Sequence, residues 1–189
     1  SLYLILYFPY LTFSKLYVFN DIGSDTIDSY WPIYAFLIDW LNTGMPLWSF
    51  KIGIGTSVLS FSSLFFDPFN IFLLFVSKQT LVYVLPYIIV LKMILSGLIF
   101  FNYLKYIKIS SQIAFIMAIM YTFNGYIVLW GQHYQFVLLF VFIPLILWGY
   151  ERLWRQNKWG MFTIAIAITA LNSYYFLYMI SIFLFVYAI

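Results

Sequence analysis

The sequence predicts an all-α membrane protein, in which a multi-span helical bundle lies in the lipid bilayer and further helices lie at its surface. Three observations predict this class: 65% of the 189 residues are hydrophobic, only 8% are charged, and the mean hydropathy is +0.97. A soluble domain carries about 25% charged residues, so this chain could not cover a water-facing surface. The net charge of +3 is too small to indicate a nucleic-acid partner.

Apolar runs mark the predicted spans. A helix needs about 20 apolar residues to cross the hydrocarbon core. The clearest run is 81–104, and the run at 2–13 predicts the tail of a first span. Because the sequence begins and ends inside apolar runs, we expect it to be part of a longer protein. Further spans are predicted near 112–130, 136–150, 159–171 and 174–189.

Basic residues predict the orientation of the bundle. Five of them lie in the connections that follow the second and fourth spans, and the alternate connections have none. The positive-inside rule places these basic connections in the cytoplasm. The long segment 14–80, between the first and second spans, is then an outer loop. The five residues are Lys105, Lys108, Arg152, Arg155 and Lys158.

The segment 14–80 is acidic and yet rich in apolar residues. It holds five of the six acidic residues and three lysines, so its net charge is −2. Between Pro32 and Gly44, apolar residues recur at helical spacing, which predicts an amphipathic helix on the membrane surface. The run 65–76 is too short to span comfortably, and we expect an interfacial or re-entrant helix there. If this run did span, the acidic residues would face the cytoplasm.

Three carboxylates follow the first span within eight residues: Asp21, Asp25 and Asp28. A carboxylate beside the membrane can act as a general base on an acceptor hydroxyl. Asp25 and Asp28 could also share a divalent cation. A solvated loop, in which aspartates form turns or cap a helix, would contain the same residues. Both interpretations stay open at this point.

Other polar residues are candidates for a substrate or phosphate site. His133 is the only histidine and lies in a predicted outer connection. Lys51 could pair with a phosphate or extend to lipid headgroups. Lys92 falls in the middle of a span, where a lysine faces protein or a cavity. Polar residues that interrupt or end spans could line a cavity or join helices, and these are Asn124, Asn172 and Tyr175.

The order of several motifs resembles the bacterial YfhO-like family, whose members are large multi-pass membrane proteins of the GT-C glycosyltransferase class. Each motif alone is weak, but together they cover nearly the whole chain, which would be the N-terminal portion of such a protein. The motifs are Ser24-Asp25 with Asp28-Ser29-Tyr30-Trp31-Pro32, Asn42-Thr43-Gly44-Met45-Pro46-Leu47-Trp48, Gly53-Ile54-Gly55, Asp67-Pro68-Phe69-Asn70, Tyr121-Thr122-Phe123-Asn124-Gly125, Pro144-Leu145 and Asn172-Ser173-Tyr174-Tyr175-Phe176.

The resemblance implies an inverting glycosyltransferase in the bacterial cell membrane. Such an enzyme takes sugar from a polyprenyl-phosphate donor on the outer face, and family members are associated with cell-wall polymers such as teichoic acid. Asp25 best matches the acidic residue that the class carries in its first outer loop, and Asp28 and Asp21 are the alternatives. A cationic group would stabilise the leaving phosphate. The candidates for that group are His133, Lys51 and Lys92.

Two other functions are compatible with the sequence. A transporter or lipid flippase would carry broken helices and paired charges at the bilayer midplane, where Lys92 is the only predicted charge. A non-catalytic scaffold for cell-envelope assembly would keep its function after Asp25→Asn and Asp28→Asn substitution.

Overall fold

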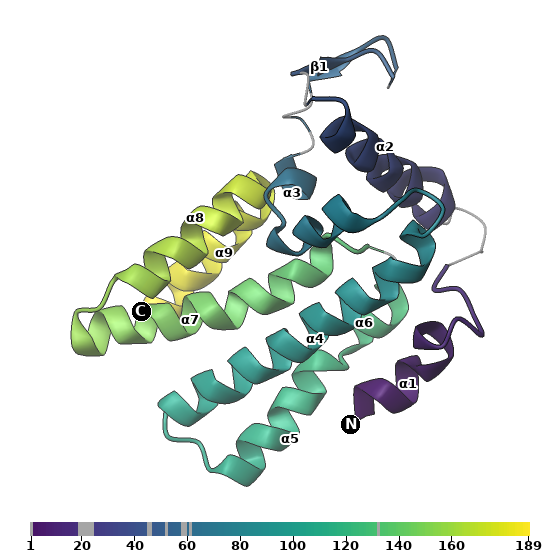
Figure 1. Cartoon of the computed structure of the whole chain (residues 1–189). Helices are drawn as coiled ribbons and strands as arrows, with labels where there is room; N and C mark the ends of the chain where they lie inside the picture. The colour runs from purple at the N-terminus through teal and green to yellow at the C-terminus, as the bar shows by residue number, and fades with distance from the viewer. Residues whose placement is uncertain are drawn as a thin grey trace. The chain divides into compact units, whose positions relative to one another are not determined.

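The computed structural model describes residues 2–18, 25–44, 47–51, 53–57, 60, 62–131 and 133–189. These residues are mostly helical, and their two strands form one short hairpin. The all-α membrane class is therefore confirmed. The chain divides into two compact units (Figure 1). Unit 1 contains Ser1–Leu91 and Gln132–Gln135, and unit 2 contains Lys92–Gly131 and Phe136–Ile189.

Three helical segments in the described residues are long and apolar enough to cross a membrane. They are Leu81–Tyr106, Ser111–Trp130 and Phe136–Gln156. The other predicted spans form shorter helices of 10, 13 and 15 residues. At 1.5 Å per residue these rise only about 15–22 Å, so whether they cross the bilayer stays a prediction. They are α1 (Leu2–Leu11), α8 (Gly160–Asn172) and α9 (Tyr174–Ala188).

Unit 1 places a π-helical turn directly before a well-covered α-helix. The turn is η1 (Thr26–Tyr30), and α2 (Trp31–Asn42) follows without a break. Pro32 lies in the first turn of α2, and Gly44 lies just past its end with φ +85°, as the sequence predicts. The five consecutive residues 34–38 are buried. Because five residues turn through more than a full circle, protein covers more of this helix than the predicted amphipathic stripe requires.

A hairpin and two short helices follow α2. β1 (Trp48–Ser49) pairs antiparallel with β2 (Thr56–Ser57). α3 (Ser62–Phe65) is followed by the 3₁₀-helix η3 (Pro68–Phe75), whose cap Asp67 accepts a hydrogen bond from the Phe69 backbone N–H at 3.0 Å. Eight residues rise about 16 Å in a 3₁₀-helix, which is too short to cross the hydrocarbon core.

Tyrosine rings form much of the core of unit 1. Tyr134 enters this core from the connection at 133–135, and its ring centroid lies 6.4 Å from Tyr17, 5.7 Å from Tyr30 and 6.0 Å from Tyr34. The Tyr134 hydroxyl donates to the Tyr17 carbonyl at 3.2 Å. Burial raises the pKa of Tyr134 to about 12, so this hydroxyl keeps its proton at neutral pH.

In unit 2, the predicted span 112–130 forms two helices. α5 (Ser111–Thr122) ends at Phe123, and α6 (Gly125–Trp130) begins after Asn124. The Asn124 side chain accepts the Ile127 backbone N–H at 3.1 Å and donates to the Tyr121 carbonyl at 2.6 Å. An asparagine that satisfies backbone groups in this way begins a new helix.

The predicted span 136–150 is longer in the structure. It forms η4 (Phe136–Leu138) and α7 (Leu139–Gln156), so Arg152 and Arg155 lie on the last turns of a helix and not in a connection. Arg155 Nε donates to Glu151 at 2.6 Å, a pair at i and i+4 that favours helix. The helix ends at Asn157, which has left-handed backbone geometry (φ 55°).

Close helix packing holds unit 2 together. Tyr103 and Leu104 of α4 (Leu81–Tyr106) pack with Ala114 of α5 and Leu147 of α7. α7 and α8 lie side by side, and α9 lies next to α8 (Figure 1). At Gly149 an added Cβ would lie 2.7 Å from the backbone of Phe162, so only glycine permits the observed approach of α7 and α8.

Candidate functional site

Two residues that the sequence nominates lie close together in unit 1: Asp25 as a candidate base and His133 as a candidate for the substrate or phosphate site. The Asp25 carboxylate, just before η1, lies 4.0 Å from Nδ1 of His133. The Tyr30 hydroxyl at the end of η1 lies 2.6 Å from the same nitrogen, although Tyr30 and His133 are 103 residues apart in the chain. The side chain of His133 is 15% exposed and that of Asp25 is 47% exposed. The carboxylate can therefore reach a substrate while the imidazole is held from within the protein.

The two neighbours of Nδ1 fix the ring of His133 in either protonation state. When Nδ1 carries no proton, the Tyr30 hydroxyl donates to it. When the ring is protonated, Nδ1–H donates to that hydroxyl, and the positive charge faces Asp25. The contact between Tyr30 and His133 therefore does not depend on which tautomer the ring adopts.

The backbone around this group is held by residues on both sides of His133. Tyr134 lies in the tyrosine core, and Gln135 accepts a hydrogen bond from Ser63 at 3.0 Å. On the opposite side, Thr26 and Tyr30 of η1 are buried. π-helical turns recur at functional sites because they redirect side chains within a helix. Here the turn directs Tyr30 inward and leaves Asp25 partly exposed.

A second group of charges lines a pocket of about 440 Å³ in unit 1. Asp39 accepts hydrogen bonds from Lys78 at 2.6 Å and from Lys51 at 3.4 Å. The hydrogen bond from Lys78, followed by the contact with Lys51, holds the pKa of Asp39 below its usual value. Asp28 also lines the pocket, so two carboxylates and two ammonium groups surround one space. The remaining lining residues are Ser29, Pro32, Ile33, Ala35 and Phe36.

This pocket offers both kinds of hydrogen-bonding partner beside an apolar wall. Carboxylates accept hydrogen bonds from hydroxyls, and each ammonium has three donors, of which Lys51 and Lys78 each direct one at Asp39. Such a lining fits a ligand that carries several hydroxyls and one anionic group.

The remaining nominated residues belong to unit 2. Lys92 and Asn172 are buried within their helices. The amide of Asn124 is engaged with backbone on both sides of the helix break, which is a structural role. Tyr175 is exposed at the start of α9, with its ring 5.3 Å from that of Phe176.

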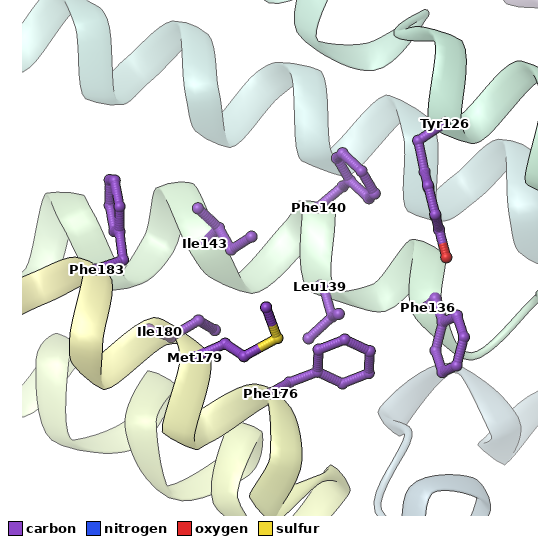
Figure 2. Close-up of a pocket in the computed structure, with 9 residues that line it drawn as sticks. All are labelled: Tyr126, Phe136, Leu139, Phe140, Ile143, Phe176, Met179, Ile180 and Phe183. Atoms are coloured by element: carbon purple, nitrogen blue, oxygen red, sulfur yellow. The ribbon is translucent and has the colours of Figure 1, made fainter.

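Unit 2 also contains an apolar pocket of about 400 Å³ (Figure 2). Figure 2 shows side chains of α7 and α9 facing one another across it, with Tyr126 and Phe136 at one end. The lining suits a hydrocarbon chain and offers nothing to balance a charge. Its other members are Leu139, Phe140, Ile143, Phe176, Met179, Ile180 and Phe183.

That Asp25 and Asp28 share a divalent cation stays a prediction. Among the described residues, no group of three or more His, Asp or Glu side chains could hold a metal ion. Asp21, the third carboxylate of the acidic cluster, lies outside the described residues.

Sequence reasoning missed Tyr30, Asp39 and Lys78. A signal for Asp39 was present, since Asp28, Pro32, Ala35 and Asp39 follow one another at spacings of four, three and four residues. That spacing places them on one helical face, and all four line the pocket. No comparable pattern links Tyr30 to His133, because their contact depends on how distant segments fold together.

Comparison with known proteins gives one positive result. Neither the curated proteins nor the solved structures include a match to this chain. The family model described as "Bacterial membrane protein YfhO" matches residues 2–189. Since this match covers nearly every residue, the chain belongs to the YfhO family of bacterial membrane proteins.

Proposed function

We propose that the chain is part of a membrane glycosyltransferase that moves a sugar, with inversion, from a polyprenyl-phosphate donor to a cell-wall polymer such as teichoic acid. The observation that carries this proposal is the Asp25 carboxylate, partly exposed and 4.0 Å from the imidazole of His133. A carboxylate held beside an imidazole is suited to accept a proton from an acceptor hydroxyl.

In the proposed reaction, Asp25 acts as the general base. The acceptor oxygen attacks the anomeric carbon and its proton passes to the Asp25 carboxylate. The bond from the anomeric carbon to the phosphate oxygen breaks, and the lipid phosphate leaves with the bonding electrons.

The distance between Asp25 and His133 favours a positioning role for the histidine. In an inverting reaction the base and the leaving group lie on opposite faces of the sugar, and inverting glycosidases separate their two carboxyl groups by about 6.5–9.5 Å for this reason. Because His133 lies only 4.0 Å from Asp25, it is too close to serve the opposite face, and the proposal puts both residues on the acceptor side. We therefore assign His133, with Tyr30, to holding the carboxylate in place.

The pocket of Asp28, Asp39, Lys51 and Lys78 is the proposed site for the sugar phosphate of the donor. The ammonium groups would stabilise the leaving phosphate, and the carboxylates would accept hydrogen bonds from sugar hydroxyls. Asp28 lies three residues from Asp25 along η1, which would bring this ligand near the base.

This function requires the acidic segment 14–80 to face the outside of the cell. The basic residues at the ends of α4 and α7 and in the connections that follow these helices support that orientation through the positive-inside rule. We propose a multi-pass arrangement with these two basic regions in the cytoplasm.

The test is a transfer assay on the full-length protein in membranes, with polyprenyl-phosphate-linked sugars and teichoic acid as acceptor. Asp25→Asn should lower the rate about 10²–10⁴-fold, the usual contribution of a general base. Glu151→Gln is the matched control, because it makes the same acid-to-amide change in unit 2.

Each result of this assay has a clear meaning. Loss of transfer in Asp25→Asn alone supports the proposal. Equal rates in wild type and Asp25→Asn would exclude Asp25 as the base and leave Asp28 and Asp21 as candidates. If wild type transfers no sugar from any donor tested, the transporter, flippase and scaffold functions become the better explanations.

A further inference from the structure

The β1–β2 hairpin of unit 1 contains two glycines with positive φ. Gly53 and Gly55 have φ of +57° and +113°, values that other residues rarely adopt. A Cβ added at Gly55 would lie 2.8 Å from Nε1 of Trp48, so the indole lies directly against this glycine. The ring of Phe50 lies 6.2 Å from that of Trp48, edge to face.

The hairpin exposes four large apolar side chains, which we call the apolar tip. Leu47 is 72% exposed, Trp48 53%, Phe50 79% and Ile54 99%. A two-stranded hairpin is at best marginally stable in water on its own. A contiguous apolar surface of this kind marks a site of interaction with another apolar phase or surface.

The composition of the hairpin indicates that the apolar tip contacts a lipid surface. Lys51 is the only charged residue between residues 47 and 57. Its ammonium lies 3.4 Å from Asp39 and is still largely exposed, so it can also meet negatively charged lipid phosphates. Tryptophan and lysine beside aliphatic residues are typical of the boundary between lipid and water. The chain, moreover, belongs to a membrane-protein family.

The backbone of the hairpin limits how deep it can lie. A two-stranded sheet leaves the outer edges of both strands unpaired, and unpaired backbone groups are costly in hydrocarbon. The headgroup layer, about 5–8 Å thick on each side of the core, still supplies water and phosphate partners.

We propose that the β1–β2 hairpin inserts its apolar tip into the interfacial layer of the bilayer. In this position Ile54 lies near the start of the acyl chains, and Lys51 remains at the phosphates. Lys51 connects the hairpin to Asp39 on α2. The hairpin then anchors one wall of the pocket lined by Asp28, Asp39, Lys51 and Lys78 to the membrane.

The test uses the absence of cysteine from the 189 residues. Ile54→Cys, labelled with the environment-sensitive fluorophore NBD, is placed in nanodiscs of phosphatidylcholine and phosphatidylglycerol. We expect blue-shifted emission, quenched more strongly by lipids with a nitroxide near the headgroup than by lipids with one deep in the acyl chain. Gln156→Cys at the end of α7 is the control, and its label should stay quenchable from water.

Two results would overturn the proposal. Emission typical of water, with efficient quenching by aqueous iodide, would place the apolar tip in solvent. Blue-shifted emission without quenching by either lipid would show that protein covers it, either another segment or a second copy. Ile54 is almost fully exposed, so the cysteine and its label displace no packed side chain.

Discussion

Tyr30 is the residue that connects the turn η1 to His133. Tyr30→Phe removes the hydroxyl at 2.6 Å from Nδ1 and keeps the ring that packs against Tyr134. A hydrogen bond of this kind contributes about 0.5–1.5 kcal/mol, so we expect kcat to fall roughly two- to tenfold with KM unchanged. Steady-state transfer kinetics across pH would measure this change.

The matched control for Tyr30→Phe is Tyr178→Phe, which changes an exposed tyrosine of α9. It should leave both constants as in wild type. A rise in KM for Tyr30→Phe, with kcat retained, would contradict a positioning role and indicate contact with substrate.

Because of Asp39, the free energy of unfolding should decrease as the pH falls into the acid range. Its pKa in the folded chain is lowered by Lys78 and then Lys51, whereas in the unfolded chain it is about 3.9. The ion pairs therefore stabilise the fold above the ordinary pKa, and this stabilisation is lost as pH falls through the lowered value. Because the lysines are exposed, we expect only about 0.2–1 kcal/mol at neutral pH.

Thermal unfolding of wild type and Asp39→Asn in detergent would check this expectation. The two melting temperatures should differ at pH 7 and converge below the lowered pKa of Asp39. Salt at about 1 M should shrink the difference at pH 7 by screening. A difference that persists in strong acid would show that charge is not its cause.

At the scale of elements, the contact of α7 with α8 depends on one glycine. In Gly149→Ala the new Cβ would lie 2.7 Å from the Phe162 backbone, which cannot rotate away as a side chain could. The helices must separate, and overpacking of this kind costs about 1–3 kcal/mol. Denaturant unfolding in mixed micelles should show this decrease in the free energy of unfolding.

Gly160→Ala provides the control for the same chemical change. A Cβ at Gly160 meets nothing within 4 Å, and the residue lies in the first turn of α8. We expect unchanged or slightly higher stability there, since alanine favours helix over glycine. Equal decreases in the free energy of unfolding for Gly149→Ala and Gly160→Ala would argue that close packing at Gly149 is not the cause.

The elements that the sequence predicts well are those with local signals. Pro32 and Gly44 mark the limits of α2, and the run 81–104 forms most of α4. The break at Asn124 was visible as a polar interruption. The extension of α7 to Gln156 was missed, because charged residues after an apolar run indicate a connection unless their pairing at i and i+4 is considered.

The site is less predictable than these elements for a physical reason. Residue type and order nominate Asp25 and His133 separately, but neither periodicity nor charge shows that they meet. Their approach depends on Tyr134 entering a core made by residues more than 90 positions earlier in the chain. Only the packed structure also reveals the contact of Tyr30 with His133.

At the scale of the whole molecule, the proposed orientation can be measured directly. Gln79→Cys lies in the segment predicted outside, and Gln156→Cys lies at the basic end of α7. A membrane-impermeant maleimide should label Gln79→Cys in intact cells and Gln156→Cys only after permeabilisation.

The opposite labelling pattern would place the acidic segment in the cytoplasm. Transfer from a donor on the outer face would then be impossible at Asp25. Labelling of both positions in intact cells would show that the helix bundle does not separate them across the bilayer.

The division of the chain into units has a consequence for biosynthesis. Residues 133–135 complete the tyrosine core of unit 1, yet about 40 residues of unit 2 are translated between Leu91 and that connection. At about 5–20 residues per second, the ribosome needs roughly 2–8 s to deliver them. During this interval Tyr134 is not yet available to the tyrosine core of unit 1. Asp25 thus gains its neighbour His133 only after the α5–α6 segment has been made.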